Sequence, residues 1–294
     1  MSEFDGFATR DVEVDGARIR CHVGGTGSPV LLLHGYPQNA YMWAKVGPAL
    51  ADEHTVVAAD LRGYGASTVT TGDDDVATYS FRAMAHDQLQ VMRTLGFDRF
   101  AVVGHDRGAR VAHRLALDEP DAVDRLAVLD IVPTLDMWRT VSKESAAAYW
   151  HWYFLTTAEP FPERLIGADP DFFFETCVET WGATRLADLD AGMLDRYRAD
   201  WRQPTMVHAS CQDYRAAATV DLEHDRVDVQ RRVDAPTLVL WGAEGRIARL
   251  FDVPDLWGRR CRDVRCEQLP GGHFFVDQHP ERTVEALRPF LRGG

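Results

Sequence analysis

The chain has 294 residues, of which 46% are apolar and 26% are charged. This length predicts one large α/β domain with an insertion. The apolar content excludes an intrinsically disordered chain, and the lack of any run of eighteen apolar residues excludes a membrane-spanning helix. The net charge of −13, with no basic stripe, excludes a nucleic-acid-binding protein.

The five cysteines are odd in number and lack the paired spacing of a zinc site or a disulfide framework. Residues 1–10 carry acidic side chains and no apolar core of a secretory signal. We therefore expect a protein of the reducing cytoplasm, with no bound metal.

Short β-branched runs alternate along the chain with longer amphipathic stretches. This pattern predicts a mostly parallel sheet with helices on both faces. A starting hairpin is expected around Asp15-Gly16, from 11–16 and 18–23. Further strands are expected at 29–33, 55–59, 100–103, 126–129, 237–241 and 264–269, and helices at 40–51, 79–95, 107–118 and 280–291.

The segment 133–225 interrupts this alternation. It holds five of the eight tryptophans and several helix-like stretches, but no clear buried strand. We interpret it as a helical cap inserted over one end of the sheet, with 1–132 and 226–294 forming the core domain. The alternative is that the helices of a single domain are longer here.

The sequence Gly104-His105-Asp106-Arg107-Gly108 follows a predicted strand and opens a predicted helix. This is the pattern of a nucleophile elbow, in which a tight turn exposes the middle side chain at the end of the sheet. The middle residue here is Asp106. The alternative is that Asp106 only caps the helix that follows.

An aspartate nucleophile restricts the chemistry. Attack of a carboxylate on saturated carbon gives an ester, which water can cleave at the carboxyl carbon to restore the enzyme. Attack on an acyl group would give an anhydride instead. Asp106 therefore indicates substrates with a carbon–halogen bond or an epoxide ring.

Hydrolysis of such an ester requires a base, and His273 follows the last predicted strand, where this architecture places its histidine. An acid between Asp106 and His273 would orient the imidazole. Asp130, at the end of its strand, is our choice over Glu244. The backbone N–H groups of Arg107 and Tyr36 are the predicted oxyanion donors.

Arg107 and Arg110 lie three residues apart at the start of the predicted helix. Two guanidinium groups on one face repel each other unless an anion lies between them, and arginine suits a carboxylate. This favours a substrate with its own carboxylate. The alternative is that one or both arginines pair with acids of the chain, such as Asp130 or Asp60.

Several segments together carry a family resemblance. Two of moderate specificity, 34–38 and 104–108, are shared with epoxide hydrolases. Far more specific are His151-Trp152 in the insertion, Asp213-Tyr214-Arg215-Ala216, and Arg107 with Arg110. Matching segments also include 129–134, 149–154, 166–170, 211–216 and 271–277. Over nearly its whole length the chain resembles the fluoroacetate (haloacetate) dehalogenases of the α/β-hydrolase superfamily.

The resemblance implies a role for each residue of the site. Asp106 would be the nucleophile, His273 the base and Asp130 the acid, and Arg107 and Arg110 would hold the substrate carboxylate. The residues around the departing halide would be His151, Trp152 and Tyr214. An imidazole N–H, an indole N–H and a phenol O–H suit fluoride, a poor leaving group that needs several directed donors. Homodimers are common in this family.

The expected reaction is hydrolysis of haloacetate to glycolate and halide through an Asp106 ester, with no organic cofactor. The nearest alternative is an epoxide hydrolase with the same nucleophile and base, whose cap acids would be Tyr153 and Tyr214. The two arginines beside Asp106 argue against a neutral epoxide. A non-catalytic ligand receptor on this fold is a third hypothesis, and the intact Asp106/His273 pair argues against it.

Overall fold

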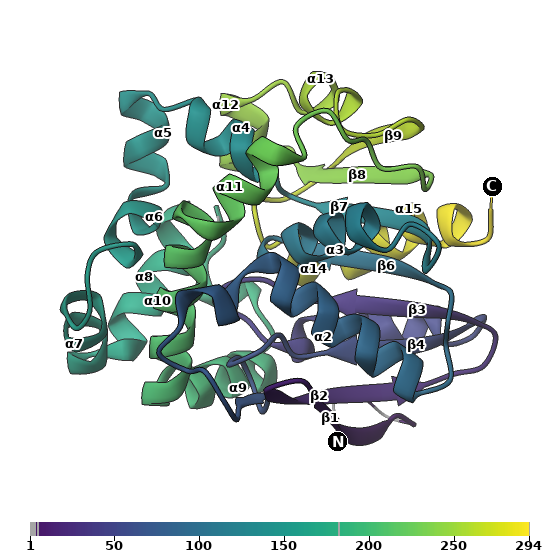
Figure 1. Ribbon diagram of the computed structural model, residues 1–294, viewed down its shortest axis with the longest axis horizontal. Helices are drawn as coiled ribbons and strands as arrows, with labels where there is room; N and C mark the ends of the chain where they lie inside the picture. The colour runs from purple at the N-terminus through teal and green to yellow at the C-terminus, as the bar shows by residue number, and fades with distance from the viewer. Residues whose placement is uncertain (1–3, 5, 182, 294) are drawn as a thin grey trace.

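The computed structural model describes residue 4, residues 6–181 and residues 183–293. Within these residues, nine strands form one sheet in the order β1-β2-β4-β3-β6-β7-β8-β9, with β5 paired to β2 (Figure 1). The strands are β1 Ala8–Val14, β2 Ala17–Gly24, β3 Ser28–Leu33, β4 His54–Ala59, β5 Thr68–Val69, β6 Phe100–His105, β7 Val123–Leu129, β8 Thr237–Gly242 and β9 Val264–Leu269.

The sheet is antiparallel at one edge and parallel elsewhere. β1 and β2 form the expected hairpin, and β2 pairs antiparallel with β4. Every neighbouring pair from β4 to β9 is parallel. The predicted fold class, a mostly parallel α/β sheet, is confirmed.

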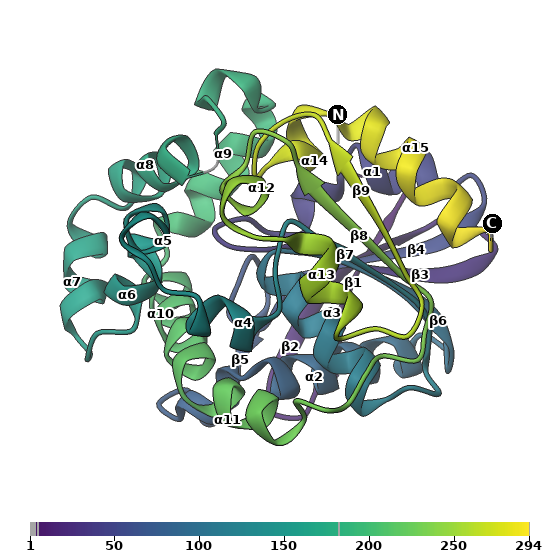
Figure 2. The same ribbon diagram turned by 90° about the horizontal axis from the view of Figure 1, so that it is seen from above.

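Helices cover both faces of the sheet (Figure 2). On one face lie α2 Phe81–Thr94 and α3 Arg107–Asp118, and on the other α1 Val46–Leu50 and α15 Pro280–Leu291. Every residue of β6 is buried, as expected for a central strand covered on both sides. β6 is therefore packed between the helices of both faces. The predicted elbow follows its carboxyl end.

The helix predicted at 40–51 is wrong as a single element. A 3₁₀ turn spans Ala40–Trp43, and α1 starts only at Val46. Pro48 lies in the first turn of α1, where its missing N–H costs nothing, but in a continuous helix it would break the hydrogen-bond ladder. The helix predicted at 79–95 begins at Phe81, because the Ser80 side chain accepts the N–H of Ala83 at 3.2 Å and caps it.

Between β7 and β8 the chain forms helices that lie beyond the carboxyl ends of the strands (Figure 1). No strand occurs in the described part of this segment. Its helices are α4 Thr134–Arg139, α5 Lys143–Ala148, α6 Trp150–Leu155, α7 Phe161–Ala168, α8 Pro170–Trp181, α9 Ala191–Trp201, α10 Pro204–Ala218 and α11 Val220–Val227, with a 3₁₀ turn at Leu186–Asp188. Their position favours the proposed cap, although α11 runs past the proposed boundary at 225.

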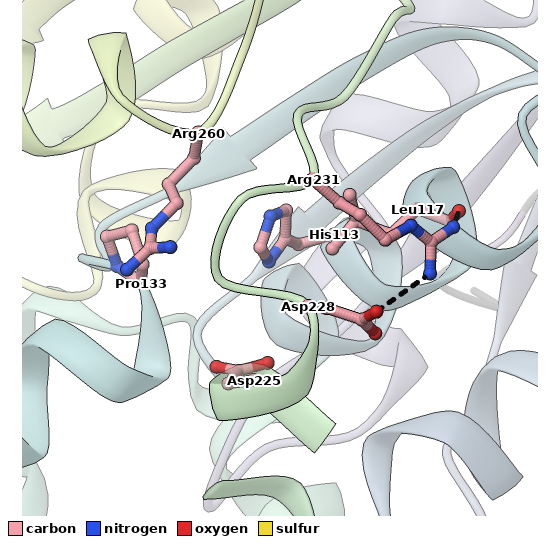
Figure 3. Close-up of a pocket in the computed structure, with 7 residues that line it drawn as sticks. All are labelled: His113, Leu117, Pro133, Asp225, Asp228, Arg231 and Arg260. Carbon is pink, nitrogen blue, oxygen red and sulfur yellow. Dashed lines mark hydrogen bonds and ion pairs between the residues drawn. The ribbon is translucent and has the colours of Figure 1, made fainter. Parts of the chain in front are cut away.

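The base of the cap is tied to the core by ion pairs. Arg114 of α3 lies 2.8 Å from Asp225, the last residue of the proposed cap, and 2.6 Å from Asp228 just beyond it, measured between guanidinium nitrogen and carboxylate oxygen. Arg260 pairs in the same way with Asp136 of α4 at 2.8 Å. Figure 3 shows the small pocket at this junction, where Arg260, Asp225 and Asp228 surround the buried His113. Both ends of the cap segment are thus fixed to the core.

The remaining helices follow β8 and β9. They are α12 Arg246–Leu250, α13 Val253–Gly258 and α14 Phe275–Gln278, and a further 3₁₀ turn spans Val76–Tyr79. In the described parts of the chain, none of the helices combines the length and the apolar content that crossing a bilayer requires.

Candidate active site

Asp106 lies in the turn between the end of β6 and the start of α3, and its φ angle is 44°. Positive φ is uncommon for a residue with a side chain, although aspartate tolerates it better than most. The backbone N–H groups of Ala109 and Arg110 donate to the carbonyl oxygen of Asp106 at 3.0 and 3.2 Å, which begins α3. The strained conformation therefore falls on the predicted nucleophile itself, as expected for an elbow.

Two neighbouring glycines are required by close approach rather than by positive φ. A Cβ atom on Gly108 would lie 2.3 Å from the carbonyl oxygen of His34. One on Gly35 would lie 2.5 Å from the Cβ atom of Asp106. The absence of these side chains lets the loop after β3 pack directly against the elbow.

The Asp106 carboxylate does not cap α3, because it forms no side-chain hydrogen bond with that helix. It accepts the backbone N–H of Tyr36 at 3.0 Å instead. The structure thus places one predicted oxyanion donor on the carboxylate. The other, the Arg107 N–H, belongs to the first residue of α3 and makes no hydrogen bond to this carboxylate in the described structure.

His273 lies in the loop after β9 and is held by Asp130, which follows β7. Its Nδ1 donates to Asp130 Oδ2 at 2.6 Å, while Asp130 Oδ1 accepts the N–H of Gly242 at 2.9 Å. A carboxylate only accepts, so Nδ1 carries the proton and Nε2 is the basic nitrogen. The alternative acid, Glu244, is exposed.

The surroundings shift the pKa values of His273 and Asp106 in opposite directions. Burial alone would lower the pKa of His273, but the hydrogen bond and charge of Asp130 and the charge of Asp106 raise it above its ordinary value. Burial would raise the pKa of Asp106, but His273, Arg110 and Arg107 together hold it below its ordinary value. At neutral pH, Asp106 is therefore a carboxylate, as a nucleophile must be.

His105 is a residue of this site that the sequence motif contained but did not explain. Its Nε2 donates to the backbone carbonyl oxygen of His273 at 2.8 Å, and burial lowers the pKa of His105 to about 3. The neutral ring therefore ties the histidine loop to the elbow. Its position directly before Asp106 was the only signal in the sequence.

The side chain of Arg107 is fully buried and pairs with an acid that was not predicted. Arg107 Nε donates to Asp213 Oδ2 at 2.8 Å, and Nη2 donates to both the Asp213 carboxylate and, at 2.9 Å, its carbonyl oxygen. The partners considered from the sequence, Asp130 and Asp60, are wrong. Asp60 instead accepts backbone N–H groups of Ala40 and Ala66.

Arg110, unlike Arg107, forms no ion pair with a carboxylate of the described residues. Its Nη1 donates to the carbonyl oxygen of Val132 at 3.0 Å and to Thr134 Oγ1 at 2.9 Å. Burial and the neighbouring Arg107 lower the pKa of Arg110 to about 10, while Asp106 opposes this, so the group stays cationic at neutral pH. Arg110 is thus a buried cation without a dedicated counter-ion in the described residues.

Each arginine also keeps one buried N–H without a hydrogen-bond partner in the described part of the chain. These are Arg107 Nη1 and Arg110 Nε. Leaving a buried charged donor unpaired costs about 1–3 kcal/mol or more. Two such donors from adjacent turns of α3, beside the Asp106 carboxylate, indicate a site for a small anion.

The three residues expected around the halide are brought together. His151 and Trp152 come from α6 and Tyr214 from α10, and all three are buried. The Tyr214 ring centre lies 5.8 Å from that of His151 and 5.6 Å from that of Trp152, with both pairs edge-on. The guanidinium carbon of Arg107 lies 4.2 Å from the Tyr214 ring centre, so the cluster adjoins the arginines.

Tyr36 belongs to the same cluster through its side chain. Its ring lies nearly parallel to that of His151, at 6.2 Å between centres, and edge-on to that of Tyr214 at 5.1 Å. Tyr153, the other tyrosine considered as an acid for epoxides, is 38% exposed. It therefore lies outside the buried cluster that contains Tyr214.

The cap also holds the loop that carries Tyr36. Trp201 of α9 donates its indole N–H to the carbonyl oxygen of Pro37 at 2.6 Å. Tyr197 of the same helix donates to Asp277 at 3.1 Å, and Asp277 also accepts Gln38 Nε2 at 2.8 Å. One cap helix thereby fixes both the loop after β3 and the helix after His273, contacts that the sequence did not predict.

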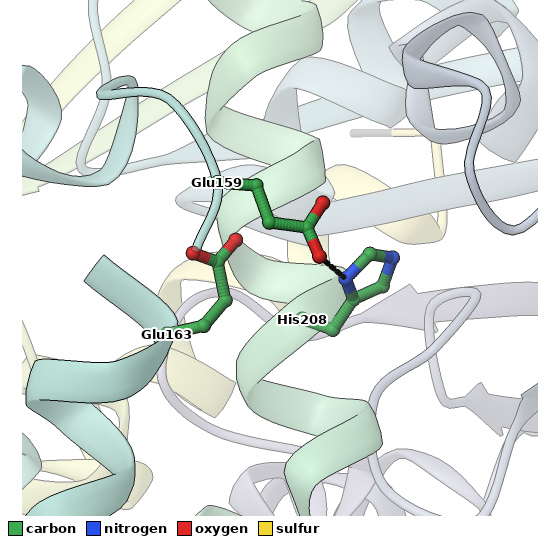
Figure 4. A group of neighbouring side chains, drawn as sticks. All are labelled: Glu159, Glu163 and His208. Carbon is green, nitrogen blue, oxygen red and sulfur yellow. Dashed lines mark ion pairs between the residues drawn. The ribbon is translucent and has the colours of Figure 1, made fainter. Parts of the chain in front are cut away.

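A group of side chains with metal-ligand chemistry lies elsewhere, between α7 and α10. Ligand atoms of Glu159, Glu163 and His208 lie within 4.8 Å of one another (Figure 4). However, Arg215 Nη1 lies 2.7 Å from Glu163 Oε1 and already supplies a cation. The group contains none of the residues of the Asp106 site.

The comparisons with known proteins agree with this geometry. The family model described as the alpha/beta hydrolase fold matches residues 28–280, so fold and site define an α/β hydrolase. A fluoroacetate dehalogenase of Burkholderia sp is 54% identical over 288 residues, which cover 98% of this chain and 95% of that protein. The chain belongs to the fluoroacetate dehalogenase family.

Other relatives are more distant in sequence or less defined in function. A soluble epoxide hydrolase of Corynebacterium sp. (strain C12) is 27% identical, over 95% of each chain. The structure of a Nostoc sp PCC 7120 protein provisionally classed as an α/β hydrolase superposes with a TM-score of 0.95. It is 49% identical and covers 98% of this chain and 99% of that chain. The identities favour the dehalogenases over the epoxide hydrolases.

Proposed function

We propose that this protein is a hydrolytic dehalogenase that converts haloacetates, fluoroacetate and chloroacetate among them, to glycolate and halide. The observation that carries the proposal is the pair of buried, unpartnered N–H groups on Arg107 and Arg110 beside an ionised Asp106. They suit a substrate that bears a carboxylate next to its reacting carbon. The 54% identical fluoroacetate dehalogenase supports the same substrate class.

In the proposed first step, the substrate carboxylate binds Arg107 and Arg110, and Asp106 attacks the halogen-bearing carbon from the side opposite the halogen. The carbon–halogen bond breaks, and the halide leaves toward His151, Trp152 and Tyr214. Halide needs directed donors because fluoride is a poor leaving group in the absence of hydrogen bonds. The product of this step is an ester of Asp106.

In the proposed second step, His273 Nε2 takes a proton from water, which attacks the carboxyl carbon of the Asp106 ester. Asp130 stabilises the imidazolium that forms. The oxyanion on Asp106 is stabilised by the Tyr36 N–H, already 3.0 Å from Oδ2, and by the Arg107 N–H. Glycolate leaves, and Asp106 is restored.

The test is release of fluoride from fluoroacetate and of chloride from chloroacetate by the purified protein. Both halides are expected. Chloride alone would leave the nucleophile and the arginines in place but argue against His151, Trp152 and Tyr214 as a fluoride site. If neither halide is released, the proposal fails and the epoxide hydrolase becomes the better hypothesis.

Arg110 provides a sharper test of the substrate carboxylate. Replacing Arg110 with methionine removes its charge and its free Nε donor, so we expect kcat/KM for chloroacetate to fall roughly 10²-fold, about 3 kcal/mol. Steady-state kinetics on chloroacetate and on uncharged chloroacetamide would measure it. The loss should be confined to the charged substrate, and equal losses on both would contradict the carboxylate site.

The pKa of His273 predicts the pH dependence. The base must be neutral, and Asp130 and Asp106 favour its charged form, so halide release should rise with pH through a midpoint above 6.5, the ordinary value. Asp106, whose pKa is lowered, stays ionised over this range. In Asp130→Asn the rate should fall and the midpoint should move to lower pH. An unchanged midpoint would mean that another group titrates.

We also infer a homodimer, as expected from the family resemblance. Its support is that neighbouring cap helices expose large apolar side chains: Phe161 and Leu165, one turn apart on α7, are 57% and 54% exposed, and Phe172 on α8 is 69% exposed. Exposed apolar surface is typical of protein interfaces. Sedimentation of the wild type should give a dimer and that of Leu165→Glu a monomer, and a monomeric wild type would overturn the inference.

A cytoplasmic location is proposed as well. Its support is that all five cysteines are free thiols, and four of them are buried. Free thiols are typical of proteins kept in a reducing compartment. Fractionation of cells that express the protein would test this proposal.

A further inference from the structure

The proposed site binds substrates in which one carbon bears both a carboxylate and the leaving atom, and a second class of molecule has the same arrangement. In a haloacetate, one carbon bears both the carboxylate and the leaving atom. In an oxirane-2-carboxylate, C2 likewise bears the carboxylate and the ring oxygen, and one further CH₂ group closes the ring. Held by Arg107 and Arg110 in the same pose, this molecule presents C2 to Asp106 and its ring oxygen to the residues assigned to the halide.

The two leaving groups differ in their need for a proton. Halide departs as a stable anion, whereas an opened epoxide leaves an alkoxide that is a much stronger base than a phenolate. A general acid is therefore required. His151 cannot supply it readily, since burial lowers its pKa to about 3 and it is neutral, and the indole N–H of Trp152 is a weaker acid still.

Tyr214 is the group that can supply this proton. It is buried in the cluster with His151 and Trp152, and its hydroxyl has no hydrogen-bond partner among the described residues. Tyr64, by contrast, already donates its hydroxyl proton to Asp213 at 2.8 Å. Burial and the charge of Asp106 raise the pKa of Tyr214, while the guanidinium of Arg107, 4.2 Å from the Tyr214 ring centre, opposes them. The phenol therefore keeps its proton until a stronger base, such as an alkoxide, forms beside it.

We propose that the same site hydrolyses oxirane-2-carboxylates to 2,3-dihydroxypropanoates, with Tyr214 as the acid that protonates the ring oxygen. The inference rests on the proposed function, because it uses the same nucleophile, base and carboxylate site. It extends the reaction to a second substrate class. Uncharged epoxides are excluded, because they leave Arg110 without an anion.

The atoms and charges of this reaction balance. An Asp106 oxygen forms a bond to C2, the bond from C2 to the ring oxygen breaks, and that oxygen takes the Tyr214 proton and stays attached through C3. Water then attacks the ester carboxyl carbon while His273 takes its proton. The product leaves, and the proton passes from His273 to the Tyr214 phenolate through solvent. One water is consumed, and nothing is oxidised or reduced.

The experiment supplies the wild-type protein with racemic oxirane-2-carboxylate, with chloroacetate and with uncharged methyloxirane in separate reactions. We expect 2,3-dihydroxypropanoate from one enantiomer, with inversion at C2, and no diol from methyloxirane. Chloride release without dihydroxypropanoate would overturn this inference and leave the proposed function standing. If neither product forms, the proposed function itself fails.

Labelled water locates the attacked carbon. Over many turnovers in ¹⁸O-water, the label should enter the hydroxyl oxygen on C2, because that oxygen comes from Asp106 and Asp106 is recharged from water. Label on C3 would mean that the nucleophile reaches the CH₂ carbon, and it would overturn the pose fixed by the arginines.

A substitution of Tyr214 distinguishes a role as general acid from a purely structural role. Tyr214→Phe should lower dihydroxypropanoate formation by roughly 10²-fold or more, the range for loss of a general acid, but chloride release by about tenfold or less. The matched control is Tyr153→Phe, on an exposed tyrosine of the same cap, which should leave both rates unchanged. Equal losses of both activities in Tyr214→Phe would overturn Tyr214 as the acid.

Discussion

Asp106→Asn is expected to abolish halide release from chloroacetate, with a fall in rate on the order of 10⁴-fold or more. An amide is neutral and a poor nucleophile, and no other carboxylate occupies the elbow. The folded structure should survive, because asparagine tolerates the φ of 44° and its side-chain oxygen can still accept the Tyr36 N–H. Halide release should be measured together with the circular dichroism spectrum.

The matched control is Asp121→Asn, on an exposed aspartate outside the site, which should retain the wild-type rate. Because asparagine can deamidate to aspartate, intact mass must be checked over the assay. A wild-type rate from protein that still carries the amide would contradict the covalent scheme. Single-turnover reaction in ¹⁸O-water adds an independent criterion, since label should enter Asp106 before it reaches glycolate.

Under the proposed function, an anionic substrate must approach the Asp106 carboxylate in a protein of net charge −13, and the charges of the site explain how it could do so. Asp213 compensates the charge of Arg107. Arg107 can therefore serve as a hydrogen-bond donor to a ligand through its free Nη1. Arg110 is left to balance either Asp106 or the substrate. The two arginines are thus balanced by Asp106 and Asp213 in the free enzyme, and in the proposed mechanism the incoming carboxylate takes over the cation that Asp106 shares before the attack.

The elements that carry the chemistry were predictable because they follow local rules. The elbow, α3 and the strand ends before Asp130 and His273 are marked by glycines and by β-branched runs, and each lies where these patterns place it. The helix expected at 40–51 is interrupted before Val46, and Pro48 is the local signal for this. The apolar period continues across the interruption and by itself predicts one helix.

Other features depend on contacts between distant segments. Asp213 pairs with Arg107, from which it is separated by 106 residues in the sequence. No local pattern near either residue predicts this ion pair. The same holds for Tyr197 and Trp201, which reach the loop after β3 from the cap. On the short helix α6, His151 and Trp152 are buried and Tyr153 is exposed. Tertiary packing, rather than residue type, determines which of these side chains face the site.

His273→Asn is expected to stop the reaction halfway. Asp106, Arg107 and Arg110 remain, so the displacement of halide should still occur once at each site, but asparagine cannot take the proton from water. We therefore expect a burst of one halide per active site, followed by a steady-state rate lower by on the order of 10⁴-fold or more. Rapid-quench halide detection would measure the burst.

The arrested protein should carry the ester itself. After reaction with chloroacetate, its intact mass should increase by one carboxymethyl group, and peptide mapping should place that group on Asp106. His86→Asn, on an exposed histidine whose Nε2 lies 3.4 Å from Asp15 Oδ2, is the matched control and should turn over normally. A variant that releases halide repeatedly at the wild-type rate would show that His273 is not the base, and halide release without an ester would mean that water attacks the substrate directly.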